Sequence, residues 1–198
     1  MVDSRNFFQK IMYGGGVLFD LAKWLIFVVI ILLFVNTYWY SVFLVDGVSM
    51  EPTILSGQLV LLNKVFYRGD TEPQRGESVV VDYPGDPKHK RYIKRVIGLP
   101  GEQVHVSQGS VYINSRKLVE SYLPFGTYTD QDGQWDLKDN QFFLMGDNRQ
   151  LSNDCRYFGP VEKRFFIGHA DWVIYPGLKR IETPAYLNGF AGGGSAIQ

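Results

Sequence analysis

The sequence has little of what several common structural and catalytic arrangements require. It contains one cysteine, Cys155, so no internal disulfide can form and the fold depends on packing. Lysine and arginine (20) balance aspartate and glutamate (20), so no global field favours nucleic acid or an acidic partner. The sequence also lacks a His-Glu-x-x-His segment, a cysteine pair and a glycine-rich phosphate loop. We therefore expect no metal and no organic cofactor.

Charge is missing from one long stretch near the N-terminus. No charged residue occurs between Lys23 and Asp46, and residues 25–35 are an unbroken apolar run with aromatic residues near both ends. As a helix, residues 24–45 would cover about 33 Å, enough for a hydrocarbon core of about 30 Å. We predict that residues 24–45 are a transmembrane anchor.

Flanking residues indicate how this anchor is oriented. Arg5, Lys10 and Lys23 precede it, whereas the first cation after it is Lys64, so residues 1–23 should be a cytoplasmic lead and the body should be extracytoplasmic in the plasma membrane. A cleaved signal peptide would need small residues after the apolar run, where this chain has Asn, Thr and three aromatics. A buried core helix is disfavoured by the charge-free length.

Beyond the anchor, short runs of β-branched and aromatic residues alternate with turn signals. The expected strands are residues 59–62, 78–81, 92–97, 104–106, 111–113, 142–145 and 170–174. No long segment of helical period occurs there, so we predict one mostly-β domain over residues 46–182. Residues 120–139 show little pattern and are interpreted as a surface insertion. The glycine-rich residues 183–198 are expected to be a flexible tail.

Ser49 is a candidate nucleophile because of its position. It lies in the segment Asp-Gly-Val-Ser-Met-Glu-Pro-Thr, residues 46–53, four residues after the predicted anchor ends. An extended chain of that length reaches at most about 14 Å, so Ser49 should act beside the bilayer. A serine hydroxyl becomes an effective nucleophile only when a neighbouring base accepts its proton.

Histidine is the usual base, but His89, His105 and His169 each occur in a charge run or a strand pattern without a catalytic setting. Lysine can serve if burial lowers its pKa. Strand alternation in residues 92–97 places Lys94 on an apolar face and Arg95 on the opposite face.

A third segment, residues 146–156, follows an expected strand and is rich in turn formers. It could be a polar loop held by local side-chain to backbone bonds. Alternatively, Ser152 could orient the lysine, while Asp154 and Arg156 fix the loop.

Together these segments resemble the bacterial type I signal peptidases, or leader peptidases, which are membrane-anchored serine proteases with a Ser/Lys dyad. The matching segments are residues 47–53, 75–77, 92–102 and 146–161. The short single-span layout is closer to the Gram-positive form. The resemblance implies a β-body of twisted antiparallel sheets.

The resemblance also implies roles for individual residues. Ser49 would be the nucleophile, Lys94 the general base and Ser152 a hydrogen-bond partner of the lysine, with Asp154 and Arg156 as a supporting ion pair. Shallow apolar pockets would hold small side chains at the first and third positions before the cut, lined by Val45, Met50, Ile54, Tyr92 and Ile93. The implied partners are signal peptides of exported preproteins that end in Ala-X-Ala-like sequences, the lipid bilayer and a nearby secretion translocon.

Two positions depart from the family pattern. Some relatives have a serine in place of Gly47, whose hydroxyl helps to stabilise the oxyanion, so here a main-chain N–H, such as that of Ser49, would have to serve. Cys155 stands where serine is usual and is interpreted as a near-isostere without a chemical role.

Three alternatives remain open at this point. A self-cleaving Ser/Lys protein of the SOS-repressor type would need a DNA-binding or partner-binding arm, whereas this chain begins with a predicted span. A non-catalytic, membrane-tethered β module is disfavoured by the presence of both dyad residues. Nucleic-acid binding through Lys88, Lys90, Arg91, Lys94 and Arg95 has no wider electrostatic footprint, so we expect no nucleic-acid partner.

Overall fold

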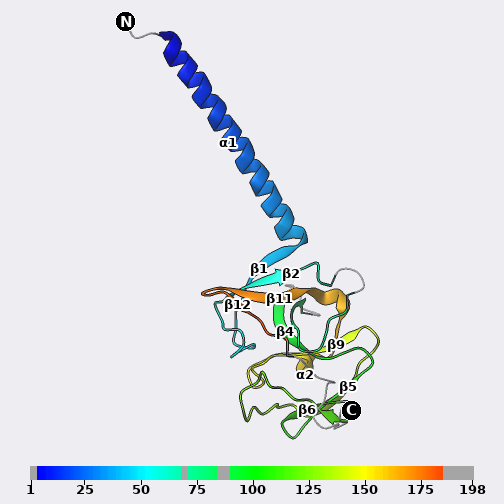
Figure 1. The fold of residues 1–198 in the computed structure, drawn as a ribbon. Coiled ribbons are helices and arrows are strands. Elements are labelled where there is room, and N and C mark those ends of the chain that lie inside the picture. Colours follow the sequence, from blue (N-terminus) through cyan, green and yellow to red (C-terminus); the bar gives the residue numbers. More distant parts are fainter. Residues whose placement is uncertain (1–3, 68–70, 84–89, 185–198) are drawn as a thin grey trace, which may run out of the picture. The chain divides into compact units, whose positions relative to one another are not determined.

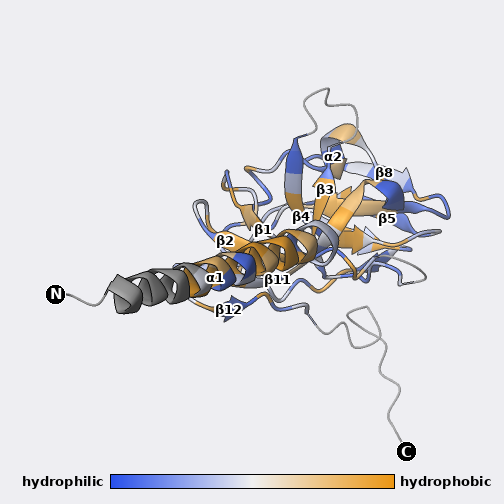
Figure 2. Ribbon diagram, turned by 90° about the horizontal axis from the view of Figure 1, so that it is seen from above, coloured by the Kyte–Doolittle hydropathy of each residue, from blue (hydrophilic) through white to orange (hydrophobic). Residues whose placement is uncertain are grey.

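The N-terminal part of the chain is one long helix. The computed structural model describes residues 4–67, 71–83 and 90–184, with only the backbone described for residues 4–15. Helix α1 runs from Ser4 to Tyr38, and its part from Gly16 to Tyr38 is long and apolar enough to cross a membrane. Large apolar side chains along this part are exposed, and Figure 2 shows the hydrophobic colouring of the ribbon there.

The predicted anchor was wrong at its C-terminal boundary. Helix α1 ends at Tyr38, and Tyr40–Leu44 is strand β1, paired with strand β2, Leu59–Asn63. Phe43 and Val45 pack against the core of the body, whereas Val42 and Leu44 point outward. The charge-free run therefore contains two different elements, because hydropathy alone does not distinguish the end of a helix from an apolar strand.

Residues 40–198 form the second compact unit, whose described part is mostly β-structure (Figure 1). The larger of its two antiparallel sheets has the strand order β1-β2-β11-β3-β4-β9-β10, with β12 also paired to β11. Its further strands are β3 (Ser78–Asp82), β4 (Arg91–Gly98), β9 (Gln141–Met145), β10 (Val161–Glu162), β11 (Phe166–Tyr175) and β12 (Lys179–Arg180). The smaller sheet has the order β7-β6-β5-β8, formed by β5 (Gln103–Ser107), β6 (Ser110–Ile113), β7 (Arg116–Lys117) and β8 (Gly133–Asp136). Short helices α2 (Cys155–Phe158) and η1 (Lys163–Phe165) follow β9.

Strands β3 and β4 are buried on both faces, which explains their nearly continuous apolar sequence. Val79 and Val96 belong to one apolar cluster, which continues onto the smaller sheet. Val80 and Ile93 belong to a second cluster that includes residues of β1, β2 and β11. Because the two clusters lie on opposite faces, the middle of β4 is shielded from water on both sides.

The predicted mostly-β fold of antiparallel sheets is confirmed, and every expected strand is present.

Residues 120–139 are not simply a surface insertion: most of their side chains are exposed or half-buried, but the interpretation was wrong for the part that joins the smaller sheet. They contain β8, which pairs with β5, and Thr129 and Leu137 are buried. The sequence signal is weak because β8 is short and its polar residues face outward. Of the predicted tail, residues 185–198 lie outside the described residues.

Candidate active site

Ser49 lies in a tight turn between β1 and β2 that is fixed by its neighbours. Met50 and Ile54 are fully buried in the second cluster, and the N–H of Ile54 donates to the carbonyl of Met50. Gly47 has φ of +122°, a conformation that other residues rarely adopt, and its N–H donates to Ser56 Oγ. Burial of the residues after Ser49 and the backbone turn before it therefore hold the serine in place.

The amine of Lys94 lies within hydrogen-bond distance of the Ser49 hydroxyl. Its Nζ lies 2.6 Å from Ser49 Oγ, although the two residues are far apart in sequence. The lysine side chain is 2% exposed and its Nζ lies 5.3 Å from the centre of the Tyr92 ring. Burial lowers the pKa of Lys94 to about 8, and Asp154 opposes this shift. Only a minor fraction of this amine is therefore neutral at pH 7, and this neutral fraction, which a general base requires, grows as the pH rises toward 8.

Gly146, directly after β9, allows the turn that carries Ser49, here called the nucleophile turn, to approach the loop after β9. An added Cβ at this position would lie 2.4 Å from the carbonyl oxygen of Ser49 and 2.3 Å from Ser152 Oγ. Two residues later, Asn148 donates its N–H to the same Ser49 carbonyl, over 3.0 Å. Only glycine permits this contact at position 146.

The predicted hydrogen bond between Ser152 and Lys94 is not formed in this structure. Ser152 Oγ is buried and has no hydrogen-bond partner among the described residues. The lysine amine is instead bonded to Ser49, so Lys94 does not bridge the hydroxyls of Ser49 and Ser152. The contact of Ser152 with Gly146 nevertheless places it next to the nucleophile turn.

The expected ion pair between Asp154 and Arg156 is present and buried. Arg156 Nε lies 2.8 Å from Asp154 Oδ1, and Asp154 also accepts the N–H groups of Gly146 and Arg156. Asp154 thereby caps α2 and closes the loop around Gly146. Arg156 reaches further to Asp130, which ties this loop to the segment before β8. Cys155 is fully buried, and burial raises the pKa of its thiol, consistent with a packing role.

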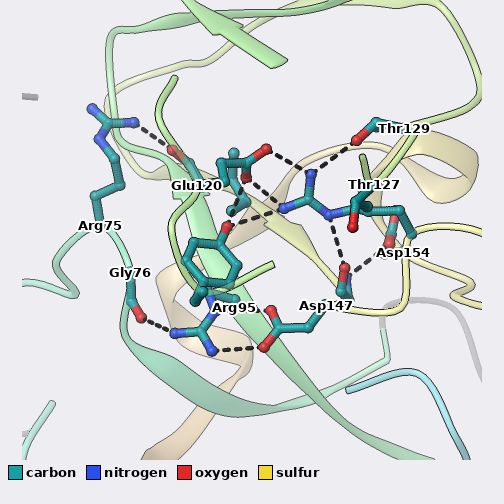
Figure 3. A network of polar contacts seen from close by, with 12 residues as sticks. Arg75, Gly76, Arg95, Glu120, Thr127, Thr129, Asp147 and Asp154 are labelled. Atoms are coloured by element: carbon teal, nitrogen blue, oxygen red, sulfur yellow. Dashed lines mark hydrogen bonds and ion pairs between the residues drawn. The ribbon is translucent and has the colours of Figure 1, made fainter. Parts of the chain in front are cut away.

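A second set of buried charges was not predicted from the sequence (Figure 3). Arg95 is fully buried and donates two hydrogen bonds to Asp147, at 2.8 Å and 2.6 Å. Arg149 is also buried and is bonded to Glu120, Thr129 and the carbonyl of Gly146. The alternation of β4 placed Arg95 opposite Lys94, but its partner lies 52 positions away, a separation that sequence pattern does not reveal.

Four of the five predicted pocket residues lie together. Val45, Met50, Ile54 and Ile93 belong to the same buried cluster beside Ser49, with exposures of 0–5%. Tyr92 packs against the other cluster. The structure thus gathers the four aliphatic residues and places the tyrosine ring on the lysine side of β4.

Other basic and histidine candidates are explained by packing. His169 lies 2.6 Å from Asp171 and stacks on Phe66, and His105 lies beside Tyr112. Lys88 and His89 lie outside the described residues. The burial of Lys94 and Arg95 takes both out of any exposed basic surface.

A serine hydroxyl bonded to a buried amine of lowered pKa is an arrangement that would suit a hydrolase with a lysine base. The sequence comparisons agree with this class. Residues 18–175 match the family described as signal peptidase, peptidase S26. The chain is 35% identical over 170 residues to signal peptidase I of Bacillus licheniformis, covering 80% of this chain and 89% of that protein.

It is also 36% identical to signal peptidase I S of Bacillus subtilis (strain 168), covering 78% of this chain and 88% of that protein. A crystal structure of a signal peptidase I from Enterococcus faecalis V583 is 31% identical and covers 50% of this chain and 96% of that chain, with a TM-score of 0.44. The chain belongs to the signal peptidase family, peptidase S26, and is a serine endopeptidase of that family.

Proposed function

We propose that this protein is a membrane-bound signal peptidase that cuts exported preproteins after Ala-X-Ala-like sites with a Ser49/Lys94 dyad. The observation that carries the proposal is the 2.6 Å contact between Ser49 Oγ and the buried Lys94 Nζ. The four aliphatic residues gathered beside Ser49 support an apolar binding region for small side chains.

In the acylation step, Ser49 Oγ attacks the scissile carbonyl carbon while its proton passes to the neutral Lys94 amine. The tetrahedral intermediate then collapses, the C–N bond breaks, and the lysine ammonium gives its proton to the leaving nitrogen. In deacylation, a water gives a proton to Lys94 as its oxygen attacks the acyl carbon, and the ammonium returns that proton to Ser49 Oγ.

The oxyanion needs a donor in place of the missing hydroxyl at Gly47. The N–H of Ser49 makes no hydrogen bond to the residues that the structure describes, and it lies on the reacting residue itself. An oxyanion donor contributes about 3 kcal/mol in comparable sites. We assign this role to the Ser49 N–H.

Helix α1 would carry the enzyme to its substrates. Its apolar part, Gly16–Tyr38, is long enough to span the bilayer once, and cations precede it. We therefore propose that the N-terminus is cytoplasmic and that the β domain lies outside the plasma membrane, near the translocon. Signal peptides are still within the bilayer when they reach such a site.

The test is cleavage of a preprotein with an Ala-X-Ala site by the full-length protein in detergent. Mass spectrometry of the new N-terminus identifies the cut bond. We expect cleavage after Ala-X-Ala that is lost in Ser49→Ala and Lys94→Ala but retained in Lys138→Ala, which removes an exposed lysine. Cleavage that survives in both dyad variants would exclude the dyad, whereas a wild-type protein that binds the preprotein without cutting it would favour a non-catalytic module.

A further inference from the structure

A cavity of about 400 Å³ lies beside the nucleophile turn, and the dyad does not use it. Its walls come from residues 51–52, 124–128 and 147–150. Glu51 follows Ser49 by two residues, a chain distance of at most about 7 Å. Asn148, which also lines the cavity, donates its N–H to the Ser49 carbonyl. The cavity therefore borders the reacting centre.

This cavity is separate from the residues expected to bind the signal peptide before the cut. Met50 is buried in the cluster with Val45, Ile54 and Ile93, whereas the next residue, Glu51, lines the cavity. Because Met50 belongs to the first region and Glu51 lines the second, a substrate whose last signal-peptide residues lie beside the first region can continue past Ser49 into the cavity.

Buried charges build the inner wall of this cavity. Asp147 and Arg149 both line it and are 2% and 1% exposed. Asp147 is neutralised by Arg95 (Figure 3), and Arg149 is neutralised by Glu120. Arg149 also holds Thr129, so the segment that forms the outer wall is tied to the loop after β9. The cavity is thus preformed, and its buried charges are compensated within the protein.

The exposed groups of the cavity suit a cationic side chain. Glu51 is half-buried and makes no ion pair with the described residues, so its carboxylate is the uncompensated charge among the lining residues that the structure describes. The side chains of Phe125 and Tyr128, which also line the cavity, are exposed. A carboxylate and aromatic rings facing one space can bind an ammonium or guanidinium by ion pairing and cation–π interaction.

We propose that this cavity binds the first residues of the preprotein after the scissile bond, and that Glu51 favours a lysine or arginine there. The inference rests on the proposed function, because the occupant is the part of the same substrate that leaves as the new N-terminus. Phe125 and Tyr128 form the apolar walls for the stem of that side chain.

The test uses the full-length protein in detergent and a set of otherwise identical preprotein peptides. Lysine, glutamine or glutamate is placed singly at each of the first four positions after the cut and, as a comparison, at the second position before it. We expect kcat/KM to be about fivefold higher for lysine than for glutamine at one or two of the positions after the cut, the size of a partly exposed ion pair with an aromatic contact.

Glu51→Gln should remove this preference by lowering kcat/KM for the lysine peptides to the value for the glutamine peptides, and Glu51→Lys should shift the preference to glutamate. The matched control Asp139→Asn, which removes an exposed carboxylate that does not line the cavity, should keep the lysine preference. A lysine preference that survives in Glu51→Gln, that occurs only before the cut, or that is absent everywhere overturns the proposal.

A binding measurement tests this inference independently of the proposed reaction. In the Ser49→Ala background, fluorescence anisotropy should show that the lysine peptide binds about fivefold more tightly than the glutamine peptide, and that Glu51→Gln removes this difference. Equal binding of the two peptides overturns the subsite even if no cleavage occurs. Cleavage without a charge preference rejects the subsite and leaves the dyad intact.

Discussion

Replacing Lys94 with methionine should stabilise the protein at neutral pH while abolishing turnover. Burial lowers the pKa of Lys94 from 10.5 to about 8. At about 1.4 kcal/mol per pKa unit, the charged lysine destabilises the folded state by about 3 kcal/mol relative to its neutral form. Methionine removes this penalty together with a hydrogen bond to Ser49 worth about 1 kcal/mol. The net gain at pH 7 should be about 2 kcal/mol.

The sign of the pH dependence follows from the lowered pKa. Below pH 8, the lysine is charged in both states and the penalty is fully present. Between pH 8 and 10.5, the unfolded state binds more protons than the folded state, so stability rises with pH as the penalty disappears. The advantage of Lys94→Met over wild type should therefore be largest below pH 8 and reach zero near pH 10. Above pH 10.5 it should become a deficit of about 1 kcal/mol, because the lost hydrogen bond to Ser49 is then no longer offset.

Thermal unfolding in detergent measures this effect. A gain of about 2 kcal/mol corresponds to a Tm increase of about 4–8 °C for a protein of this size at pH 7. Lys138→Met is the control, because Lys138 is exposed and its substitution should leave Tm almost unchanged at either pH. A lower Tm for Lys94→Met at pH 7, or a difference that is the same at pH 7 and pH 10, would refute the reasoning.

Three further substitutions test the structure around the dyad. Gly146→Ala should reduce kcat at least 100-fold in a cleavage assay, because its Cβ would overlap the carbonyl of Ser49; near-normal activity would contradict the close approach. Ser152→Ala should leave Tm within about 2 °C, since the hydroxyl is buried without a described partner, and a large Tm loss would show a missing hydrogen bond. Asp147→Asn should destabilise the protein by about 3–5 kcal/mol, because it leaves Arg95 buried beside a neutral partner, and denaturant unfolding with an unchanged midpoint would exclude this.

Much of the β domain follows from local sequence pattern. The expected strands were present because their β-branched and aromatic runs are bounded by turns, as at Gly98–Gly101 after β4. Ser49 and Lys94 were predicted together because the order of the matching segments carried information that neither residue has alone. Their 2.6 Å contact is consistent with that prediction.

The errors arose where long-range contacts decide the structure. Strand β1 is apolar enough to be assigned to the membrane, and only its pairing with β2 makes it part of the sheet. Residues 120–139 lack periodicity, yet Glu120 is held by Arg149, 29 positions away. The partner of Arg95 is similarly distant. Hydropathy and spacing along the chain contain no information about such pairs.

The most direct test of the Ser49/Lys94 dyad is the pH dependence of acyl-enzyme formation in a single turnover. A preprotein substrate is mixed with excess full-length enzyme, and the reaction is quenched at short times. The acylated residue of the enzyme is then identified by peptide mass spectrometry. The dyad predicts acylation at Ser49, with a rate that rises tenfold per pH unit below the Lys94 pKa of about 8 and then levels off. Acylation of another residue, or a rate that is constant between pH 6 and 9, would contradict it.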